Sequence, residues 1–319
     1  MGQPLLSVLI SVYNHEKYIE ECLRSIAAQK TTFDFEVLVG EDCSTDGTRA
    51  LLQRLQAELP SNFVFLFREQ NMGAVANGED LYARSRGKYL VDFEGDDFMV
   101  YEGKFQQQVD FLEEHPEYTV VYTNCSVVGN ESEPLAEGYP QCLDDDYSYK
   151  ENFYSVLPGH SGTSVCRREE YFAMRDKFMA LKSYGFYPGD RRNAFMFLTM
   201  GKVRCIQQPW SVYRHVTKGG SSYSANLKKD RKFAENEVEF GRTLVAFADN
   251  YGDAEAQHWA RMNLFRFRLR WCFSSVKLER FGVIWRDARK EQHSFALLCS
   301  YLRWGCVLLT RVLRGRTIV

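Results

Sequence analysis

The sequence lacks several features that mark common classes of protein. Its 319 residues contain no window of 18 apolar residues, so we expect no membrane-spanning helix. The first segment, MGQPLLSVLISVYN, has no cationic stretch and no small-residue cleavage site, so we expect no secretory signal. The nine cysteines form no C-x-x-C pair and no zinc-like spacing with histidine, which favours a reduced, intracellular protein. The net charge of −2 gives no indication of a nucleic-acid partner, and we expect none.

The sequence does contain enough apolar surface for a large core. Hydrophobic residues make up 45% and charged residues 26%, which excludes a disordered or low-complexity chain. The length fits roughly two domains, or one domain with an extension. Charge is unevenly distributed, because the segment from Asn250 onward carries 13 Lys and Arg against 5 Asp and Glu. The sequence therefore predicts an acidic body with a basic tail.

Short apolar runs alternate with helical spacing over the first 125 residues. The runs predict buried strands at 5–12, 36–40, 62–67, 88–93 and 118–123. Strand–helix alternation at this spacing predicts an α/β fold, with a mostly parallel central sheet and helices on both faces. The polar sequence of residues 126–160 predicts an irregular connection. Beyond residue 225 the spacing of apolar residues predicts helices. The segment 265–271 (FRFRLRW) alternates as a strand would, but it also fits helical spacing, and we favour a helix.

Ligands of such sheets bind beyond the carboxyl ends of the strands. This rule nominates Tyr13 and Asn14 after the first strand, Glu41 and Asp42 after the second, and the loop 94–97 after the fourth. Two of these three loops are acidic. A loop that cradles phosphates directly would instead contain glycines and a basic residue. The acidic loops therefore indicate a metal ion, or recognition of hydroxyl groups and base edges.

Three segments taken together resemble the nucleotide-sugar-binding half of glycosyltransferase family 2. They are SVLISVYN at 7–14, VLVGEDCSTDGT at 37–48 and KYLVDFEGDD at 88–97, followed by KFQQQVDFLEEHPEY at 104–118. The resemblance covers residues 5–125 well and 160–220 more loosely. It implies a GT-A fold and an inverting transfer from a nucleoside diphosphate sugar. A divalent cation, Mn²⁺ or Mg²⁺, would then neutralise the diphosphate leaving group, and both cations prefer oxygen ligands.

The resemblance also implies roles for individual residues. Asp97 is assigned to the metal, Asp96 either shares the metal or contacts the ribose, and Asp42 accepts a hydrogen bond from the nucleobase. An Asp-Asp pair taken alone would equally suit a turn or a helix N-cap. The residues assigned to the nucleotide-sugar are Ser11, Val12, Tyr13, Asn14, Asp42, Asp96 and Arg214.

A carboxylate before the helix-like segment RRNAFMFLTMG resembles the catalytic aspartate of the family. It is Asp190, which would deprotonate the acceptor hydroxyl from the face opposite the leaving group. The alternative is an ordinary helix N-cap. Further along, Tyr213-Arg214 resembles the family's Y-R element, and either Arg214 or His215 would meet the diphosphate, with His215 a further candidate for the metal. The glycine-containing segment 218–220 suits a flexible lid.

Two departures from the family and one isolated histidine affect these assignments. The first carboxylate of the acidic loop is Glu94 rather than the commoner aspartate, and Ala76 stands where many relatives carry an arginine. The group that meets the diphosphate is therefore open. His160, in PGHSGTS, could line an acceptor pocket, although a plain loop histidine is the commoner case.

The C-terminal segment 296–319 has the pattern of a basic amphipathic helix. Its leucines and arginines lie on different sides of a helical wheel, and no acidic residue follows Glu291. Such a helix suits the surface of an anionic membrane, or it packs its leucine stripe on the protein body.

These observations give one interpretation and two rivals. We expect a GT-A domain at 1–225, with a nucleotide-sugar half at about 1–125 and an acceptor half at about 126–225, and a helical basic extension at 226–319. The expected reaction is metal-dependent, inverting transfer from a nucleoside diphosphate sugar, with UDP favoured, to a glycan or lipid-linked acceptor in surface polysaccharide synthesis. The expected location is cytoplasmic, or peripheral on the inner membrane. The rivals are a nucleotidyltransferase that makes a nucleotide-sugar and a non-catalytic sugar-nucleotide-binding module.

Overall fold

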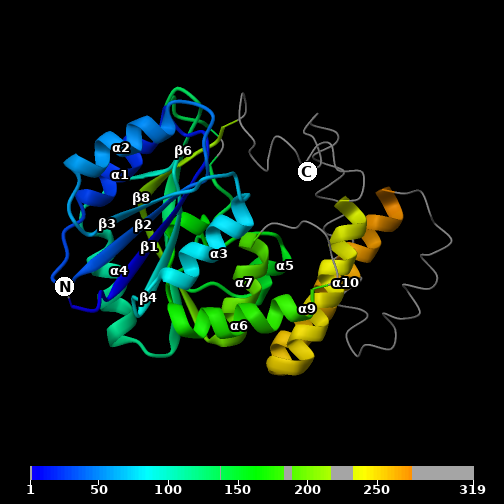
Figure 1. Cartoon of the computed structure of the whole chain (residues 1–319). Coiled ribbons are helices and arrows are strands. Elements are labelled where there is room, and N and C mark those ends of the chain that lie inside the picture. Colours follow the sequence, from blue (N-terminus) through cyan, green and yellow to red (C-terminus); the bar gives the residue numbers. More distant parts are fainter. Residues whose placement is uncertain (1, 137, 183–188, 217–232, 275–319) are drawn as a thin grey trace. The chain divides into compact units, whose positions relative to one another are not determined.

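The computed structural model describes residues 2–136, 138–182, 189–216 and 233–274 (Figure 1). The chain divides into two compact units. The first comprises Met1–Lys177 and Pro188–Lys228, and the second comprises Phe178–Tyr187 and Lys229–Val319. The segments 218–220 and 296–319, for which we expect a lid and an amphipathic helix, lie outside the described residues.

The first unit is built on one mixed sheet of eight strands, in the order β3-β2-β1-β4-β7-β6-β8-β5. Strands β3, β2, β1 and β4 are parallel to one another, and β6 and β8 form another parallel pair. Strand β7 is antiparallel to β4 and β6, and β5 is antiparallel to β8. The strands are β1 Leu6–Val12, β2 Phe35–Glu41, β3 Phe63–Phe67, β4 Tyr89–Glu94, β5 Phe98–Met99, β6 Tyr118–Val128, β7 Val165–Arg167 and β8 Lys202–Arg214.

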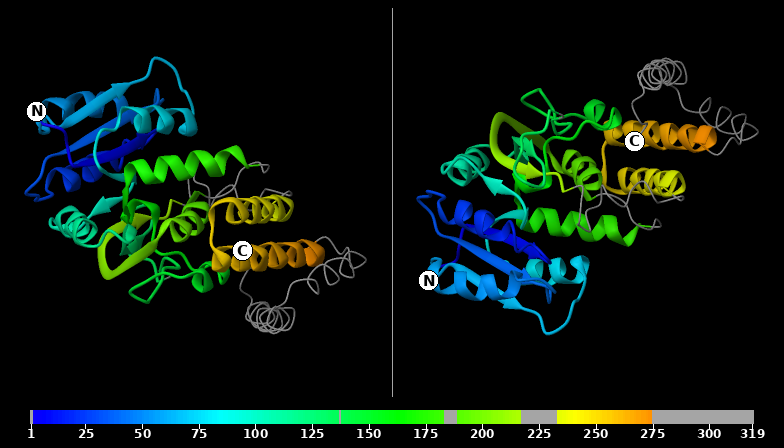
Figure 2. Two further views of the ribbon diagram at one scale, coloured as in Figure 1. Left: turned by 90° about the horizontal axis from the view of Figure 1, so that it is seen from below. Right: turned by 90° about the horizontal axis from the view of Figure 1, so that it is seen from above.

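Helices lie on both faces of this sheet (Figures 1 and 2). Helices α1, α2 and α4 share one buried apolar cluster with β1, β2 and β4, and α3 packs against β1 and β2. The helices and turns of this unit are α1 Ile19–Ala27, α2 Thr48–Glu58, α3 Ala74–Arg84, α4 Lys104–Glu114, α5 Tyr149–Phe153, the 3-10 turn η1 Ser161–Thr163, α6 Arg168–Ala180 and α7 Gly189–Met200. The expected α/β architecture is therefore confirmed.

The sequence pattern explains why these elements form. Alternate residues of β1 point to opposite faces of the sheet, and Leu6, Val8, Ile10 and Val12 all enter the shared apolar cluster. The apolar residues of α1 recur at spacings of three and four, so one face of this helix is buried against the same cluster (Ile19, Cys22, Leu23 and Ile26). All five strands expected from the sequence are present, and β6 runs further than expected, to Val128.

The second unit contains two long helices, α9 Phe233–Tyr251 and α10 Ala254–Ser274, which pack along one another. Phe240 of α9 contacts Phe267 of α10 with ring centroids 6.1 Å apart. The fully buried side chain of Glu237 forms an ion pair with Arg270 at 3.2 Å. The segment 265–271 lies in α10, so the expected helix is confirmed. Among the described residues, no helix is both long enough and apolar enough to cross a membrane.

Candidate active site

The loops that follow β1 and β2 are joined by hydrogen bonds. The side-chain oxygen of Asn14 accepts from the backbone N–H of Thr45 at 2.8 Å, and the Asn14 N–H donates to Ser44 Oγ at 3.0 Å. Asn14 has a φ of 58°, a left-handed conformation that asparagine tolerates better than most residues. The segment Ser11–Asn14 therefore lies beside the loop that carries Asp42, as the two parallel strands require.

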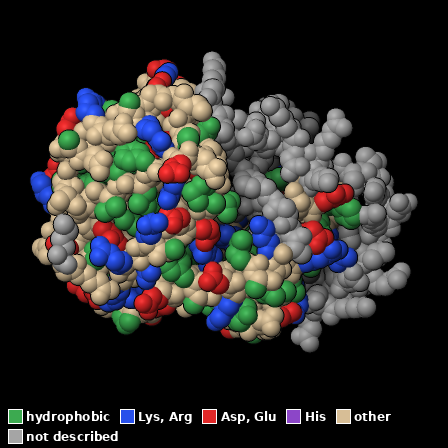
Figure 3. Space-filling view, viewed as in Figure 1, with side chains coloured by type: hydrophobic (Ala, Val, Ile, Leu, Met, Phe, Trp, Pro, Cys, Tyr) green, Lys and Arg blue, Asp and Glu red, His purple; other side chains and the backbone are tan. Residues whose placement is uncertain are grey.

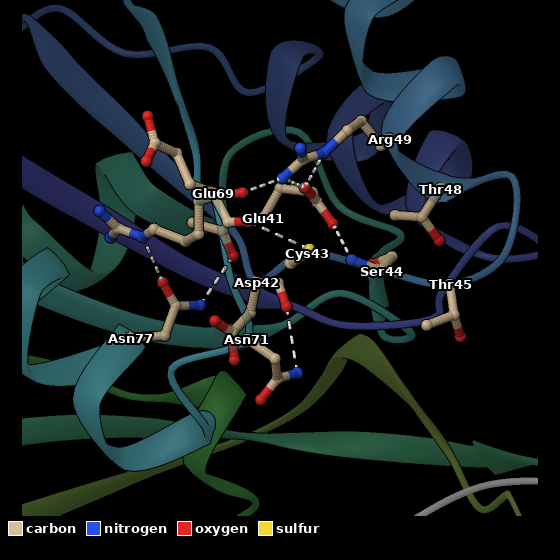
Figure 4. A network of polar contacts seen from close by, with 12 residues as sticks. Glu41, Asp42, Cys43, Ser44, Thr45, Thr48, Arg49, Glu69, Asn71 and Asn77 are labelled. Atoms are coloured by element: carbon tan, nitrogen blue, oxygen red, sulfur yellow. Dashed lines mark hydrogen bonds and ion pairs between the residues drawn. The ribbon is translucent and has the colours of Figure 1, made fainter.

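Asp42 is almost fully buried and fixes the turn that precedes α3 (Figure 4). Its Oδ1 accepts from the Met72 N–H at 2.7 Å and its Oδ2 from the Gly73 N–H at 2.9 Å. Asn71 Nδ2 donates to the Asp42 carbonyl at 3.1 Å. Each carboxylate oxygen keeps a second lone pair. A contact between Asp42 and a nucleobase stays a prediction. The hydrogen bonds to Met72 and Gly73 show that Asp42 also stabilises the turn before α3.

Glu41 has a supporting role that the sequence does not reveal (Figure 4). Its carboxylate accepts from the Ser44 N–H at 2.5 Å and from Arg49 Nε at 2.6 Å. Asn77, next to the Ala76 that replaces an arginine, donates to the Gly40 carbonyl at 2.8 Å. These buried contacts hold the end of β2 against α2 and α3.

The carboxylates predicted to carry the chemistry influence one another strongly. Although Glu94 is exposed as a whole residue, loss of water around its carboxyl group raises its pKa to about 8, and the charges of Asp96, Asp190 and Asp92 act in the same direction. Groups with strongly shifted pKa values gather at functional sites. The fold therefore brings the acidic loop and Asp190 together, although they are distant in sequence. Asp92 belongs to the same cluster, and no sequence pattern marks it because it lies inside strand β4.

Asp97 is buried beneath this cluster and is 2% exposed. Its Oδ1 accepts from the Arg214 backbone N–H at 2.8 Å, and its Oδ2 lies 3.4 Å from His160 Nδ1. Burial, Asp96 and Glu94 raise the pKa of Asp97 well above its usual value. Burial lowers the pKa of His160 to about 4, so His160 is neutral at neutral pH and the contact is not an ion pair.

Asp96 has an oxygen that suits a ligand. Its Oδ1 is buried and has no hydrogen-bond partner among the described residues. The preceding Gly95 lies so close to His15 that a Cβ there would come within 2.7 Å of His15 Nδ1. Any other residue at this point of the loop would force His15 and Ile19 to move. No residue spacing in the sequence links His15 to the acidic loop, and only the fold places it there.

Arg214 is held by protein groups on every side and its side chain is 1% exposed. Its Nε donates to the Asp96 carbonyl at 3.0 Å, its Nη1 to Ser132 Oγ at 2.8 Å, and its Nη2 to Glu21 at 2.9 Å. The guanidinium also lies over the Tyr18 ring at 4.5 Å. A contact between Arg214 and a diphosphate stays a prediction. In the structure, Arg214 holds the acidic loop in place.

Asp190 lies in the first turn of α7, and two hydroxyl groups lie near its carboxylate. The Tyr139 hydroxyl donates to Asp190 Oδ2 at 3.5 Å, and the nearby Ser161 side chain also stabilises the carboxylate and lowers its pKa. Burial raises the pKa of Asp190, and these two donors and nearby Arg192 oppose that effect.

His215, the other candidate near the diphosphate, donates its backbone N–H to the Val128 carbonyl at 2.8 Å and stacks on Tyr213.

The donor set fits a divalent cation that is shared with a substrate. No group of three or more His, Cys, Asp or Glu in the described part of the chain is arranged to hold a metal alone. Mg²⁺ is usually bound by one or two carboxylates together with substrate phosphates. The unpartnered oxygen of Asp96, whose charge raises the pKa values of Glu94 and Asp97, meets that requirement.

Charged side chains of both signs lie interspersed over the described part of the surface in Figure 3. The net charge of −2 is nearly balanced over the whole chain. The carboxylates of the acidic loop are therefore a local concentration of negative charge.

The family model for glycosyl transferase family 2 matches residues 7–172, and the chain belongs to this family. The match spans the loops after β1, β2 and β4, and so contains most of the site described above.

Particular relatives agree with this assignment. The chain is 29% identical over 157 residues to the putative teichuronic acid biosynthesis glycosyltransferase TuaG of Bacillus subtilis, covering 49% of this chain and 61% of that protein. The structure of Staphylococcus aureus TarS 1-349 with UDP-GlcNAc matches with a TM-score of 0.59 and 19% identity, covering 87% of this chain and 75% of that one. The mannosyltransferase PcManGT of Pyrobaculum calidifontis, in complex with GDP-Man and Mn²⁺, matches with a TM-score of 0.55 and 17% identity over 96% and 81% of the chains. The chain spans less than two thirds of the length of the first curated relatives that it matches.

Proposed function

We propose that this chain transfers a sugar, with inversion, from a nucleoside diphosphate sugar to a hydroxyl group of a glycan or lipid-linked acceptor. The observation that carries the proposal is that the acidic loop at the end of β4, with the buried and unpartnered Oδ1 of Asp96, lies near enough to Asp190 of α7 for their charges to interact. The family membership supports the reaction class. The UDP-GlcNAc complex of TarS supports a UDP-sugar donor, and the name of TuaG supports surface polysaccharide synthesis.

The nucleoside is assigned to the joined loops after β1 and β2. Ser11, Val12, Tyr13 and Asn14 line the end of β1, and Asp42 lies beside them. Tyr13 is solvent-exposed at 36%, which leaves its ring available to a base. Asp42 would accept from the base with a lone pair that the Met72 and Gly73 N–H groups leave free.

A divalent cation, Mn²⁺ or Mg²⁺, is assigned to Asp96, supported by Asp97 and with His215 as a further candidate. When bound, it would neutralise the charge that develops on the leaving diphosphate. Asp96 is better placed than Asp97 in the described structure, because both oxygens of Asp97 already lie against protein groups. The main task of Asp97 is then to hold the Arg214 backbone, and through it the loop. The Mn²⁺ complex of PcManGT supports this part of the proposal.

Asp190 is assigned as the general base. A base works best when its pKa lies near the operating pH, and burial raises the pKa of Asp190 in that direction. The hydroxyl groups of Tyr139 and Ser161 hold the carboxylate in one orientation, so that it can accept the proton of an acceptor hydroxyl at a fixed place.

Thermal melting with UDP, with and without Mn²⁺, tests the donor site, and a panel of nucleotide-sugars tested for metal-dependent turnover identifies the donor. We expect a rise in melting temperature that requires both UDP and Mn²⁺. A protein that no nucleotide stabilises and that turns over no donor would contradict the proposal.

We also propose that the segment 296–319 contacts an anionic membrane surface. Its sequence supports this idea through the leucine stripe and through Arg303, Arg311 and Arg314, which share one side of the helical wheel and are each worth about 1 kcal/mol near such a surface. Flotation with anionic vesicles should capture the full chain at low salt and release it at high salt. A full chain that never floats would contradict this part of the proposal.

A further inference from the structure

The turn at residues 159–164 is locked by its own hydrogen bonds. The backbone N–H and the hydroxyl of Thr163 both donate to the His160 carbonyl, at 2.9 and 2.7 Å. The N–H and the hydroxyl of Ser164 donate in the same way to the Ser161 carbonyl, at 3.1 and 2.7 Å. A Cβ at Gly159 would lie 2.9 Å from the Thr123 carbonyl, so the turn also packs closely on β6. These contacts give the turn one rigid shape.

Two neighbouring side chains of this turn reach two different parts of the site. His160 Nδ1 lies 3.4 Å from Asp97 Oδ2 of the acidic loop, a close contact without a hydrogen bond. The side chain of Ser161 lies close enough to the carboxylate of Asp190, at the start of α7, to lower the pKa of that carboxylate. Asp97 and Asp190 are far apart in sequence, and a single rigid dipeptide therefore spans the distance between them.

Tyr139, from a third segment of the chain, contacts both His160 and Asp190. Its ring meets the His160 ring edge-on, with centroids 5.2 Å apart and an interplanar angle of 89°. Its hydroxyl donates to Asp190 Oδ2 at 3.5 Å. The Tyr213 ring covers His160 from another side, with centroids 4.3 Å apart. The histidine is thus fixed between two tyrosines and cannot turn away from Asp97 without breaking this packing.

We propose that His160, Ser161 and Tyr139 are positioning residues, which set the place of Asp190 relative to the Asp96–Asp97 loop. The inference rests on the proposed function, in which the leaving group is held at that loop and the acceptor is activated by Asp190. Inversion requires these two groups on opposite faces of the sugar. An error of about 1 Å in such a geometry can cost on the order of 10²-fold in rate. None of the three residues needs to touch the reacting atoms to have this effect.

The kinetic test compares Ser161→Ala and Tyr139→Phe with wild type. Each variant removes one hydroxyl group that lies near the Asp190 carboxylate. We therefore expect kcat to fall about tenfold or more while the KM for the donor changes little. Ser161→Thr keeps a hydroxyl and should recover most of the loss. Ser126→Ala, at an exposed position of β6, is the matched control and should behave as wild type. Unchanged kcat in both Ser161→Ala and Tyr139→Phe would overturn the proposal.

His160→Phe tests the other half of the arrangement. Phenylalanine preserves the packing between Tyr139 and Tyr213 but removes the nitrogen that faces Asp97. We expect weaker Mn²⁺-dependent binding of UDP, measured by calorimetry, at a melting temperature close to that of wild type. Binding equal to that of wild type would show that His160 does not position the acidic loop.

A measurement that needs no turnover separates this inference from the proposed function. Carbon-13 NMR of the Asp190 carboxyl group follows its titration directly. The groups that face it are Ser161, Tyr139 and Arg192, together with the acidic side chains of Asp92 and Glu94. Loss of a hydroxyl donor destabilises the carboxylate, so Ser161→Ala should raise the pKa of Asp190. An unchanged titration would overturn the positioning role even if the enzyme is active, and a raised pKa would support it even if no donor is found.

Discussion

The backbone N–H of Arg214 donates to Asp97 Oδ1 at 2.8 Å, while the guanidinium of the same residue donates to the Asp96 carbonyl at 3.0 Å. One residue at the end of β8 therefore holds both aspartates of the acidic loop. Glu21 of α1, Ser132 and the Gly129 carbonyl also accept from the guanidinium. The geometry of the loop is thus tied to a strand and a helix far from it in sequence.

Arg214→Met should lower the free energy of unfolding by about 3 kcal/mol, because buried acceptors lose a charged donor. Arg214→Lys should recover only part of this, since an ammonium group cannot reproduce the planar fork of donors. Chemical denaturation measures both. Arg204→Met, which removes a more exposed arginine paired with Asp145 and Asp146, is the matched control and should cost less than about 1 kcal/mol. Equal losses in Arg214→Met and Arg204→Met would contradict the supporting role of Arg214.

Asp96→Asn should abolish the extra stabilisation that Mn²⁺ gives in the presence of UDP. The substitution keeps the shape of the side chain but removes the charge of the unpartnered oxygen. Thermal melting with UDP and increasing Mn²⁺ measures the effect. Asp144→Asn, at an exposed position, should retain the full metal-dependent shift. If Asp96→Asn retained the shift as well, the metal would have to be assigned elsewhere.

Glu94→Gln should make the metal-free protein more stable at high pH. The pKa of Glu94 is raised from 4.5 to about 8 in the folded protein. Between these values the folded protein holds a proton that the unfolded chain has lost, so Glu94 destabilises the fold progressively as the pH rises. The melting temperatures of variant and wild type should agree below pH 4.5 and diverge towards pH 8, with the variant higher.

Glu113→Gln is a control of opposite sign for this pH series. A hydrogen bond from Lys88 lowers the pKa of Glu113, so its carboxylate stabilises the fold once the pH exceeds its unfolded value. That variant should therefore melt slightly lower than wild type at neutral pH. A Glu94→Gln curve that runs parallel to wild type at every pH would contradict the clustering of carboxylates around Glu94.

Asp190→Asn should preserve the affinity for UDP and lose about 10²–10⁴-fold in turnover, the usual contribution of a positioned base. Asparagine retains the shape of the side chain and its ability to accept from Ser161 and Tyr139. Calorimetry with UDP and steady-state kinetics separate the two effects. A matching loss of UDP affinity would instead place Asp190 in the donor site or give it a structural role.

The sequence predicts the strands and the acidic loop because their signals are local. The apolar alternation of β1 and the spacing of apolar residues in α1 are visible within a few residues, and both elements form as expected. The carboxylates after β2 and β4 are equally visible, because the ends of parallel strands always meet at one edge of a sheet.

The supporting contacts could not be predicted because they depend on packing between distant segments. Nothing near Arg214 in the sequence indicates that Glu21 and Asp96 surround it. The close approach of His15 to Gly95 has no signal in residue spacing. Asp92 looks like an ordinary strand residue, and only the fold brings its charge near Glu94.

The most direct test of the central claim is the configuration of the sugar that leaves an α-linked nucleotide donor. Proton NMR during metal-dependent hydrolysis, with water as the acceptor, resolves the first anomer formed before the anomers equilibrate. The proposed function predicts that the β anomer appears first, that release stops when the metal is chelated, and that Asp190→Asn releases far less. Initial release of the α anomer, or release that is unaffected by chelation, would contradict it.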